Sequence, residues 1–150
     1  MNHDEYSDEY LRDVLGGQGV VAVVGLSNNP LRPSHGVFLA LLRMGFPAVG
    51  VNPGLAGKEI GGAPVYASLA DVPGPIAIVD VFRNSEAAGE TVDEALALPT
   101  LPRAIWLQLG VRNDAAARRA EARGVKVVMD LCIKVEAMRL GVYPARTPRA

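Results

Sequence analysis

The stretch VVGLSNNPLRPSHG (residues 23–36) runs from a series of valines through a glycine into a loop of Ser, Asn, Pro and Arg. Gly25 ends the hydrophobic run, and a helical pattern begins near Ser34. A buried strand, a polar loop and a helix in this order are typical of the first unit of an open α/β sheet. The rest of the chain repeats the alternation of strand and helix.

Five hydrophobic runs rich in Val and Ile recur along the chain. They are VVAVVG (20–25), PAVGVNP (47–53), IAIVDVF (76–82), RAIWLQLG (103–110) and VKVVMD (125–130). Each run is almost continuous rather than alternating, which predicts strands covered on both faces. Helix-like segments lie between the runs, as parallel strands require. The prediction is an α/β fold: a doubly wound parallel sheet of about five strands, with helices on both faces, in a single domain.

The expected domain spans residues 7–142, and the tail 143–150, which carries prolines and arginines, is expected to be loosely ordered. The segment 54–75 interrupts the alternation. Its glycines and prolines predict a loop with a short extended piece near 58–60 and a short helix near 68–71.

Capping residues and glycines mark the expected helix ends. Ser85 is a suitable N-cap for the helix after the third hydrophobic run. The last helix is expected to begin at Asp130 and to end at Gly141, since glycine commonly follows the last helical residue.

Composition narrows the function classes. The chain has 150 residues, of which 49% are hydrophobic and 21% charged, with a net charge of -1, so no basic surface for nucleic acid is expected. A single cysteine rules out an internal disulfide framework and suits a reducing cytoplasm. The acidic start lacks the apolar part of a signal peptide, and no run is long enough to cross a membrane. We expect a soluble cytoplasmic protein without nucleic acid or membrane partners, in which an apolar helix face would suit pairing into a homo-oligomer.

Ligands of open α/β sheets bind beyond the carboxyl ends of the strands. At the first of these ends, Gly25 permits close approach of the backbone, and the helix starting near Ser34 offers free N–H groups and a positive dipole end. Both features favour a phosphate group, and guanidinium groups suit phosphate oxygens. The cations expected around this edge are Arg32, Lys58, Arg83 and Arg112.

Two common nucleotide-binding classes fit the sequence less well. An NAD site usually has an acidic residue at the end of the second strand, where this chain has the neutral Asn52, and Gly25 does not begin a G-x-G-x-x-G motif. The chain also lacks the Walker A pattern G-x-x-x-x-G-K-[ST]. An NAD(P)-dependent oxidoreductase stays open as an alternative, as does an interaction module that has kept the fold without a ligand.

Five segments carry a resemblance to a known family. They are VVGLSNNPLRPS, VNPGLAGKEIGGAPVYASLADVP, IVDVFRNSE, WLQLGVRN and VVMDLCIKVEAMRL, in this order. Together they resemble the small single-domain coenzyme A-binding proteins, whose fold is similar to the N-terminal domain of the succinyl-CoA synthetase alpha subunit. The resemblance covers about residues 7–142. It implies a Rossmann-like domain in which coenzyme A, free or acylated, lies across the carboxyl edge of the sheet.

The resemblance also implies individual roles. The diphosphate would be held by Gly25, Leu26, Ser27, Arg32, Pro33 and Ser34. The adenosine would be flanked by Asn52, Pro53 and Lys58. The same groove would be lined by Phe82 and Arg83, and the pantetheine arm would be approached by Gln108 and Gly110. The chain departs from the family's usual pattern at His35, where an aromatic or small residue is common, and at Leu131, where a basic residue is common.

Cys132 is the candidate nucleophile because it follows a strand and precedes a helix. Catalysis would need a base, and the two histidines are His3, near the N-terminus, and His35, on another loop. A role for Cys132 as a half-buried hydrophobic residue is favoured, with a mixed disulfide to the thiol of coenzyme A as the alternative. Scattered Asp residues and two distant histidines make no metal ligand set. The sequence favours a binding protein over a stand-alone catalyst, and assigns no catalytic or metal-ligating residue.

Overall fold

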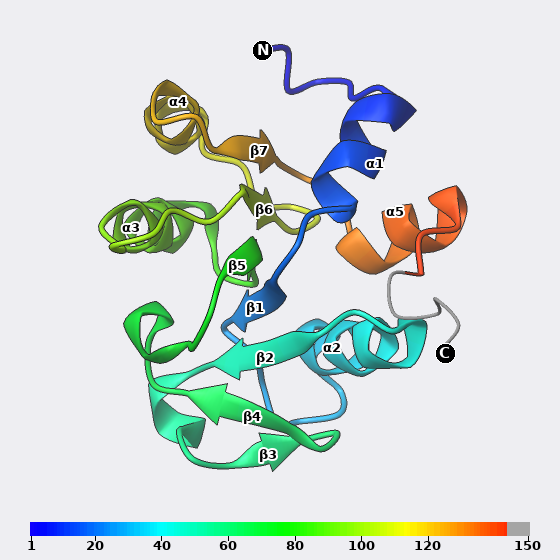
Figure 1. Cartoon of the computed structure of the whole chain (residues 1–150), viewed down its shortest axis with the longest axis vertical. Coiled ribbons are helices and arrows are strands. Elements are labelled where there is room, and N and C mark those ends of the chain that lie inside the picture. The colour runs from blue at the N-terminus through cyan, green and yellow to red at the C-terminus, as the bar shows by residue number, and fades with distance from the viewer. Residues whose placement is uncertain (144–150) are drawn as a thin grey trace.

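The computed structural model describes residues 1–143 (Figure 1). Its helices are α1 (Asp8–Leu15), α2 (Pro33–Met44), α3 (Ser85–Leu96), α4 (Asp114–Ala122) and α5 (Ile133–Leu140), with 3-10 turns η1 (Pro53–Leu55) and η2 (Leu69–Asp71). Its strands are β1 (Val20–Val24), β2 (Ala48–Val51), β3 (Glu59–Ile60), β4 (Ala63–Tyr66), β5 (Ile76–Val81), β6 (Ala104–Leu107) and β7 (Lys126–Val128). The expected loose tail at 143–150 lies, except for its first residue, outside the described residues.

The strands form one sheet in the order β3-β4-β2-β1-β5-β6-β7. Neighbouring strands are parallel except β3 and β4, which are antiparallel. From β1 the chain builds outward through β2 and β4, then returns to the other side of β1 for β5, β6 and β7. The direction of building therefore reverses between β1 and β5, where Val24 pairs with Val51 on one side and with Val81 on the other. Ligand crevices of open α/β sheets form at such reversals.

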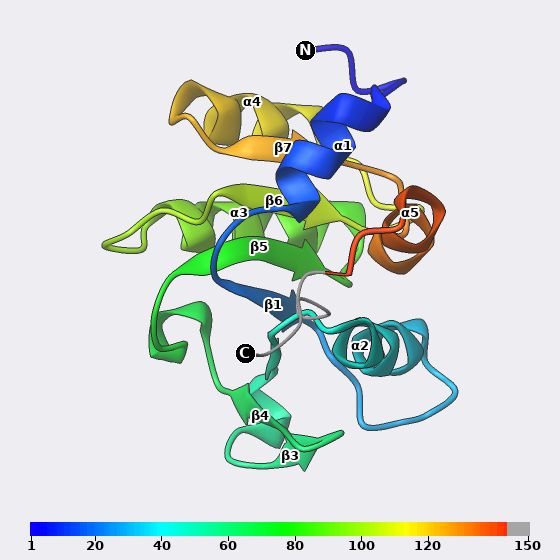
Figure 2. The same cartoon turned by 45° about the vertical axis from the view of Figure 1, so that its right-hand side comes forward.

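Helices cover both faces of the sheet (Figures 1 and 2). Buried side chains of α1, α2 and α5 pack on one face in a cluster that we call the α2-side core. Buried side chains of α3 and α4 pack on the opposite face in the α3-side core. The predicted α/β domain with a largely parallel sheet and helices on both faces is confirmed. Within residues 1–143, no helix combines the length and the apolar character needed to cross a membrane.

The sheet has two strands more than the expected five, both within the segment 54–75. The extended piece expected near 58–60 is β3, and the short helix expected near 68–71 is the turn η2. The strand that the sequence reading missed is β4, which pairs with β2 through Val51 and Tyr66. It has only four residues, and Pro64, which lacks an N–H group, interrupts its pattern.

One expected helix cap and one expected helix start differ in the structure, although α3 does begin at Ser85. Asn84 rather than Ser85 is the N-cap of α3, since its side chain accepts a hydrogen bond from the N–H of Ala87. The last helix begins at Ile133, not at Asp130. Asp130 adopts a left-handed backbone conformation with φ 61°, and its carboxylate accepts a hydrogen bond from the N–H of Gly110 at 2.7 Å. Asp130 therefore closes a turn instead of starting a helix.

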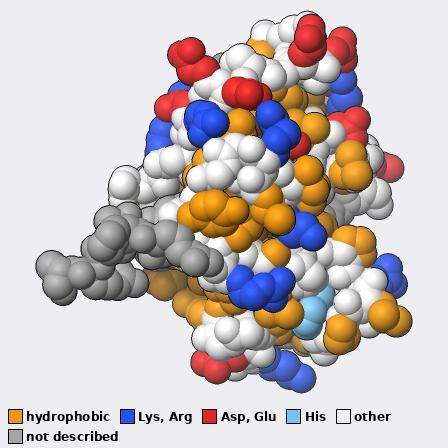
Figure 3. Space-filling view, turned by 90° about the vertical axis from the view of Figure 1, so that its right-hand side faces the viewer, with side chains coloured by type: hydrophobic (Ala, Val, Ile, Leu, Met, Phe, Trp, Pro, Cys, Tyr) orange, Lys and Arg blue, Asp and Glu red, His pale blue; other side chains and the backbone are white. Residues whose placement is uncertain are grey.

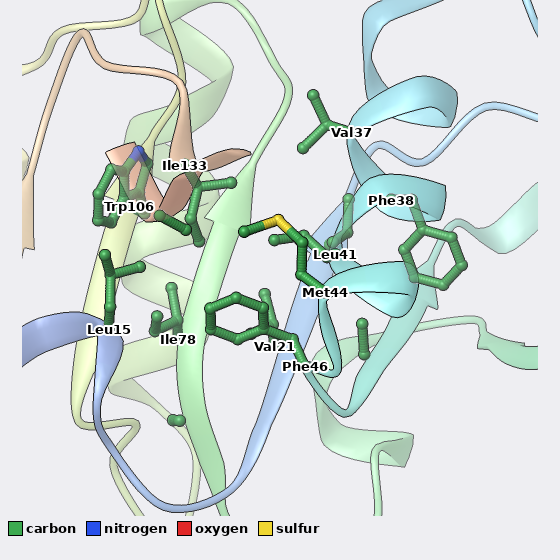
Figure 4. Packing of buried hydrophobic residues seen from close by; sticks show 14 of the residues in the cluster. Leu15, Val21, Val37, Phe38, Leu41, Met44, Phe46, Ile78, Trp106 and Ile133 are labelled. Carbon is green, nitrogen blue, oxygen red and sulfur yellow. The ribbon is translucent and has the colours of Figure 1, made fainter. Parts of the chain in front are cut away.

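Trp106 on β6 is fully buried in the α2-side core, near Ile133 of α5 (Figure 4). Its indole Nε1–H donates a hydrogen bond to the carbonyl oxygen of Leu131 at 2.8 Å. This bond ties the segment between β7 and α5 to the centre of the sheet. Trp106 thus supports the position of the residues that lead into α5.

Replacement of Trp106 by Phe should lower the free energy of unfolding by about 1–3 kcal/mol, because it leaves the Leu131 carbonyl unpaired and reduces packing in the core. Urea denaturation followed by circular dichroism measures the change. The control is Val135→Ala, at a half-exposed position of α5, which should change stability by about 0.5 kcal/mol or less. Equal stability of Trp106→Phe and the wild type would contradict the structural role of this hydrogen bond.

Candidate functional site

The loop after β1 begins at Gly25, which has φ +86°. A Cβ atom at this position would lie 2.5 Å from the carbonyl oxygen of Phe82, at the end of β5. No side chain fits at that distance, and a positive φ also favours glycine. Glycine is therefore required where the ends of β1 and β5 meet.

The remainder of this loop is tied to the first turn of α2. The hydroxyl of the buried Ser34 accepts a hydrogen bond from the N–H of Ser27 at 3.0 Å. His35, one of the two departures from the resembled family, donates from Nδ1 to the carbonyl oxygen of Ser27 at 2.9 Å. Both contacts hold the loop against the N-terminus of α2, and His35 has a local structural partner.

A cavity of about 600 Å³ opens at the reversal between β1 and β5, and we call it the main cavity. It is bounded by the β1 loop, the start of α2, the residues after β5 and β6, and the start of α5. Its lining residues are Gly25, Ser27, Arg32, Pro33, Ser34, Val37, Phe82, Arg83, Asn84, Gln108, Leu109, Val111 and Cys132. The lining combines hydroxyl, amide and guanidinium groups with apolar side chains.

Arg32 and Arg83 make this cavity electropositive. No Asp or Glu belongs to its lining, and within residues 1–143 neither arginine forms an ion pair. Arg112, expected as a third cation of the edge, instead pairs with Asp4 and Asp114, and both contacts raise the pKa of its guanidinium. Figure 3 shows Lys and Arg side chains among hydrophobic ones in the middle of one face, with most acidic groups toward its upper end. Two unpaired guanidinium groups in one cavity suit an anion with several oxygens.

A smaller cavity of about 300 Å³ lies on the other side of Gly25, and we call it the side cavity. Its lining residues are Val24, Gly25, Val51, Asn52, Pro53, Ala67, Arg83 and Glu94. Gly25 and Arg83 belong to both cavities. A ligand held at these two residues can therefore extend in both directions along the carboxyl edge of the sheet.

The residues predicted to bind the ligand fall into three groups. The main cavity brings together Gly25, Ser27, Arg32, Pro33, Ser34, Phe82, Arg83 and Gln108. The side cavity adds Asn52 and Pro53. Neither cavity is lined by Leu26, Lys58 or Gly110.

The three predicted residues outside the cavities have other positions. Leu26 is fully buried in the α2-side core. Its carbonyl oxygen accepts a hydrogen bond from the amide of Asn52 at 2.8 Å. Lys58 has an exposed side chain in the segment before β3, and Gly110 donates its N–H to Asp130. Leu26 and Gly110 thus support the fold around the site.

The family follows from comparison of the chain with known sequences. The family model described as a CoA binding domain matches residues 19–138. The chain belongs to the CoA binding domain family. A Bacillus subtilis (strain 168) protein, called uncharacterized protein YneT, is 38% identical over 125 residues, which are 83% of this chain and 90% of that protein.

Solved structures similar to this CoA binding domain share its fold. Cell-free ID.343 from Thermus thermophilus has 37% sequence identity and a TM-score of 0.82, over 90% of this chain and 99% of that one. A hypothetical protein from Pyrococcus horikoshii OT3 has 31% identity and a TM-score of 0.82, over 91% of this chain and 94% of that one. The α/β architecture is thus shared along nearly the full length of both.

Sequence reasoning missed several lining residues of this CoA binding domain. Asn84 directly follows Arg83 at a strand end, so its position in the sequence could have identified it. Val37 was recognised only as part of an apolar helix stripe. Glu94 enters the side cavity from α3, and no sequence signal connects it with the end of β2. Among residues 1–143, no group of three or more His, Cys, Asp or Glu residues could hold a metal ion.

Asp80 lies directly beneath the floor of the main cavity. It projects toward α2 and α5, since Val79 and Val81 on either side of it belong to the α3-side core. On that face, the row at the cavity floor consists of Gly25, Phe82 and Gln108, and the row beneath consists of Val23, Asp80 and Trp106. Asp80 is fully buried, and neither of its carboxyl oxygens has a hydrogen-bond partner among the described residues. Burial therefore raises the pKa of Asp80 well above its ordinary value of 3.8.

This raised pKa predicts a pH-dependent difference between the wild type and Asp80→Asn. From about pH 4 upward the unfolded chain releases the Asp80 proton while the folded protein retains it, so the stability from this group falls as pH rises toward the folded-state pKa. Asparagine does not titrate. The free energy of unfolding of Asp80→Asn minus that of the wild type should therefore increase with pH, by up to about 1.4 kcal/mol per pH unit. Urea unfolding of both proteins between pH 4 and 8 measures it, and parallel profiles would contradict a neutral Asp80.

Proposed function

We propose that the protein binds coenzyme A, free or acylated, at the carboxyl edge of its sheet and acts in the cytoplasm as a binding protein. The observation that carries the proposal is the main cavity of this family member. It presents Arg32 and Arg83 beside the N-terminus of α2, and none of the described residues that line it is an Asp or Glu. Helix N-termini and guanidinium groups both favour phosphate oxygens.

The two adjoining cavities support an orientation for the ligand. The diphosphate would lie at Gly25 and Arg83, which both cavities share. The adenosine would then occupy the side cavity near Asn52 and Pro53. The pantetheine arm would cross the main cavity from the end of β1 past β5 to β6, about 10 Å at the usual strand spacing. Its thiol would reach the part of the wall formed by Val111 and Cys132.

The lining of the main cavity supports binding rather than stand-alone catalysis. Cys132 is its one thiol, and within residues 1–143 no His, Asp or Glu lines the cavity to act as a general base. The imidazole Nδ1 of His35 is hydrogen-bonded to the Ser27 carbonyl. The proposed role is therefore to hold the coenzyme, with chemistry supplied elsewhere.

Coenzyme A should raise the melting temperature of the wild type, because a ligand that binds only the folded state stabilises it. At a concentration about 100 times Kd, the stabilisation is about 2.7 kcal/mol, or about 5–10 °C for a chain of this size. Arg83→Glu should abolish the shift by placing a carboxylate beside the diphosphate. The measurement is a thermal-shift titration with reduced coenzyme A and a reductant.

The matched control is Arg118→Glu, the same charge reversal at an exposed position of α4, which should retain the wild-type shift. NAD should produce no shift in any of the three proteins. A shift with NAD but not with coenzyme A would favour a nicotinamide-dependent oxidoreductase. No shift with either compound would contradict the proposal and favour an interaction module without a nucleotide ligand.

A further inference from the structure

Cys132 lies at the α5 end of the main cavity. It is the only cysteine of the chain, is partly exposed and occupies the N-cap position of α5. Its neighbours on this part of the wall, Leu109 and Val111, are apolar. Arg32 and Arg83 belong to the segments after β1 and β5. A ligand whose anionic group meets these arginines can therefore direct an uncharged arm along the apolar wall toward the thiol.

Hydrogen bonds on both sides fix the backbone that carries Cys132. The preceding residue, Leu131, accepts the indole N–H of Trp106 at 2.8 Å. The following residue, Ile133, donates its N–H to the side-chain oxygen of the buried Gln108 at 3.1 Å. Trp106 lies on β6 and Gln108 immediately follows this strand. The two hydrogen bonds therefore fix the position of the Cys132 backbone relative to the sheet edge.

Asp80 is a buried polar group one row below this end of the cavity. Its carboxyl is fully buried on the sheet face that α2 and α5 cover, and has no partner among the described residues. Buried polar groups are nearly always satisfied by protein, water or ligand. The observation depends neither on the cysteine nor on the arginines.

We propose that Cys132 forms a mixed disulfide with the pantetheine thiol of coenzyme A, so that the protein holds the coenzyme covalently under oxidising conditions. The proposal rests on the function proposed above, because the diphosphate contacts at Arg32 and Arg83 bring the sulfur to Cys132. The mixed disulfide gives the main cavity a second, redox-dependent mode of binding coenzyme A.

The reaction is a thiol–disulfide exchange with the symmetric disulfide of coenzyme A. The Cys132 thiol releases its proton to solvent, and the thiolate attacks one sulfur of the bound disulfide. A bond forms between Sγ and that sulfur, the original S–S bond breaks, and the second coenzyme A leaves as a thiolate that takes up a proton. Cys132 is oxidised and the departing coenzyme A is reduced, so no further oxidant is needed. An added thiol reverses the reaction.

The test uses the full chain and two disulfides with the same reacting group. Coenzyme A disulfide carries the diphosphate and nucleotide, whereas pantethine, the disulfide of pantetheine, lacks both. Intact-mass spectrometry follows the appearance of one adduct, which for coenzyme A adds the mass of the coenzyme less two hydrogen atoms. Binding at the arginines raises the local concentration of the sulfur. The wild type should therefore react at least about tenfold faster with coenzyme A disulfide than with pantethine at equal concentration.

Variants separate directed exchange from the general reactivity of a thiol. Cys132→Ser should form no adduct with either disulfide. Arg83→Glu should react with both disulfides at similar rates, while Arg118→Glu should keep the wild-type preference. Circular dichroism of each variant checks that it is folded, and a reductant should release the coenzyme from the wild-type adduct.

The possible failures are distinguishable. A thermal shift with reduced coenzyme A, but no adduct with its disulfide, overturns the mixed disulfide and leaves the binding function intact. Equal rates with coenzyme A disulfide and pantethine in the wild type also overturn it, because Cys132 is then only a reactive surface thiol. If the thermal shift and the rate preference are both absent, the proposed function fails as well.

Discussion

The close approach of the ends of β1 and β5 is the constraint on which the site depends. With a Cβ atom at position 25 only 2.5 Å from the Phe82 carbonyl oxygen, any side chain would push the two strand ends apart. The same position separates the main cavity from the side cavity, and both are lined by Gly25 and Arg83. The absence of a side chain at Gly25 thus permits the close parallel pairing of β1 and β5 and leaves space where the two cavities meet.

The central strands and the core of the site could be predicted because both depend on local signals. A parallel strand covered on both faces has a nearly continuous hydrophobic run, and the runs 20–25 and 76–82 show this pattern. Parallel strands also end at one edge, so residues that directly follow β1 and β5 must lie close together. Arg83 was assigned to this edge from its place after β5, and Arg32 from its place in the loop between β1 and α2.

The rest of the site depends on contacts between segments far apart in the sequence. β4 is defined by its pairing with β2 and β3, and its short run with Pro64 gives no independent signal. Asn52 was expected to flank the adenosine and does line the side cavity, but its amide also joins the β2 end to the β1 loop by donating to Leu26. The hydrogen bond from the N–H of Gly110 to the Asp130 carboxylate likewise depends on the segment after the neighbouring strand β6.

Asp80 is a position where the residue present differs from the one that would best stabilise the fold. Of the buried polar side chains, Ser34 and Gln108 accept backbone N–H groups, and Thr91 donates to the carbonyl oxygen of Ala87. Asp80 has no partner among the described residues. An apolar side chain would avoid the desolvation penalty of a buried carboxyl, and the residues on either side of Asp80 are valines. Conflicts between local stability and sequence gather at functional sites, and this one lies directly beneath the main cavity floor.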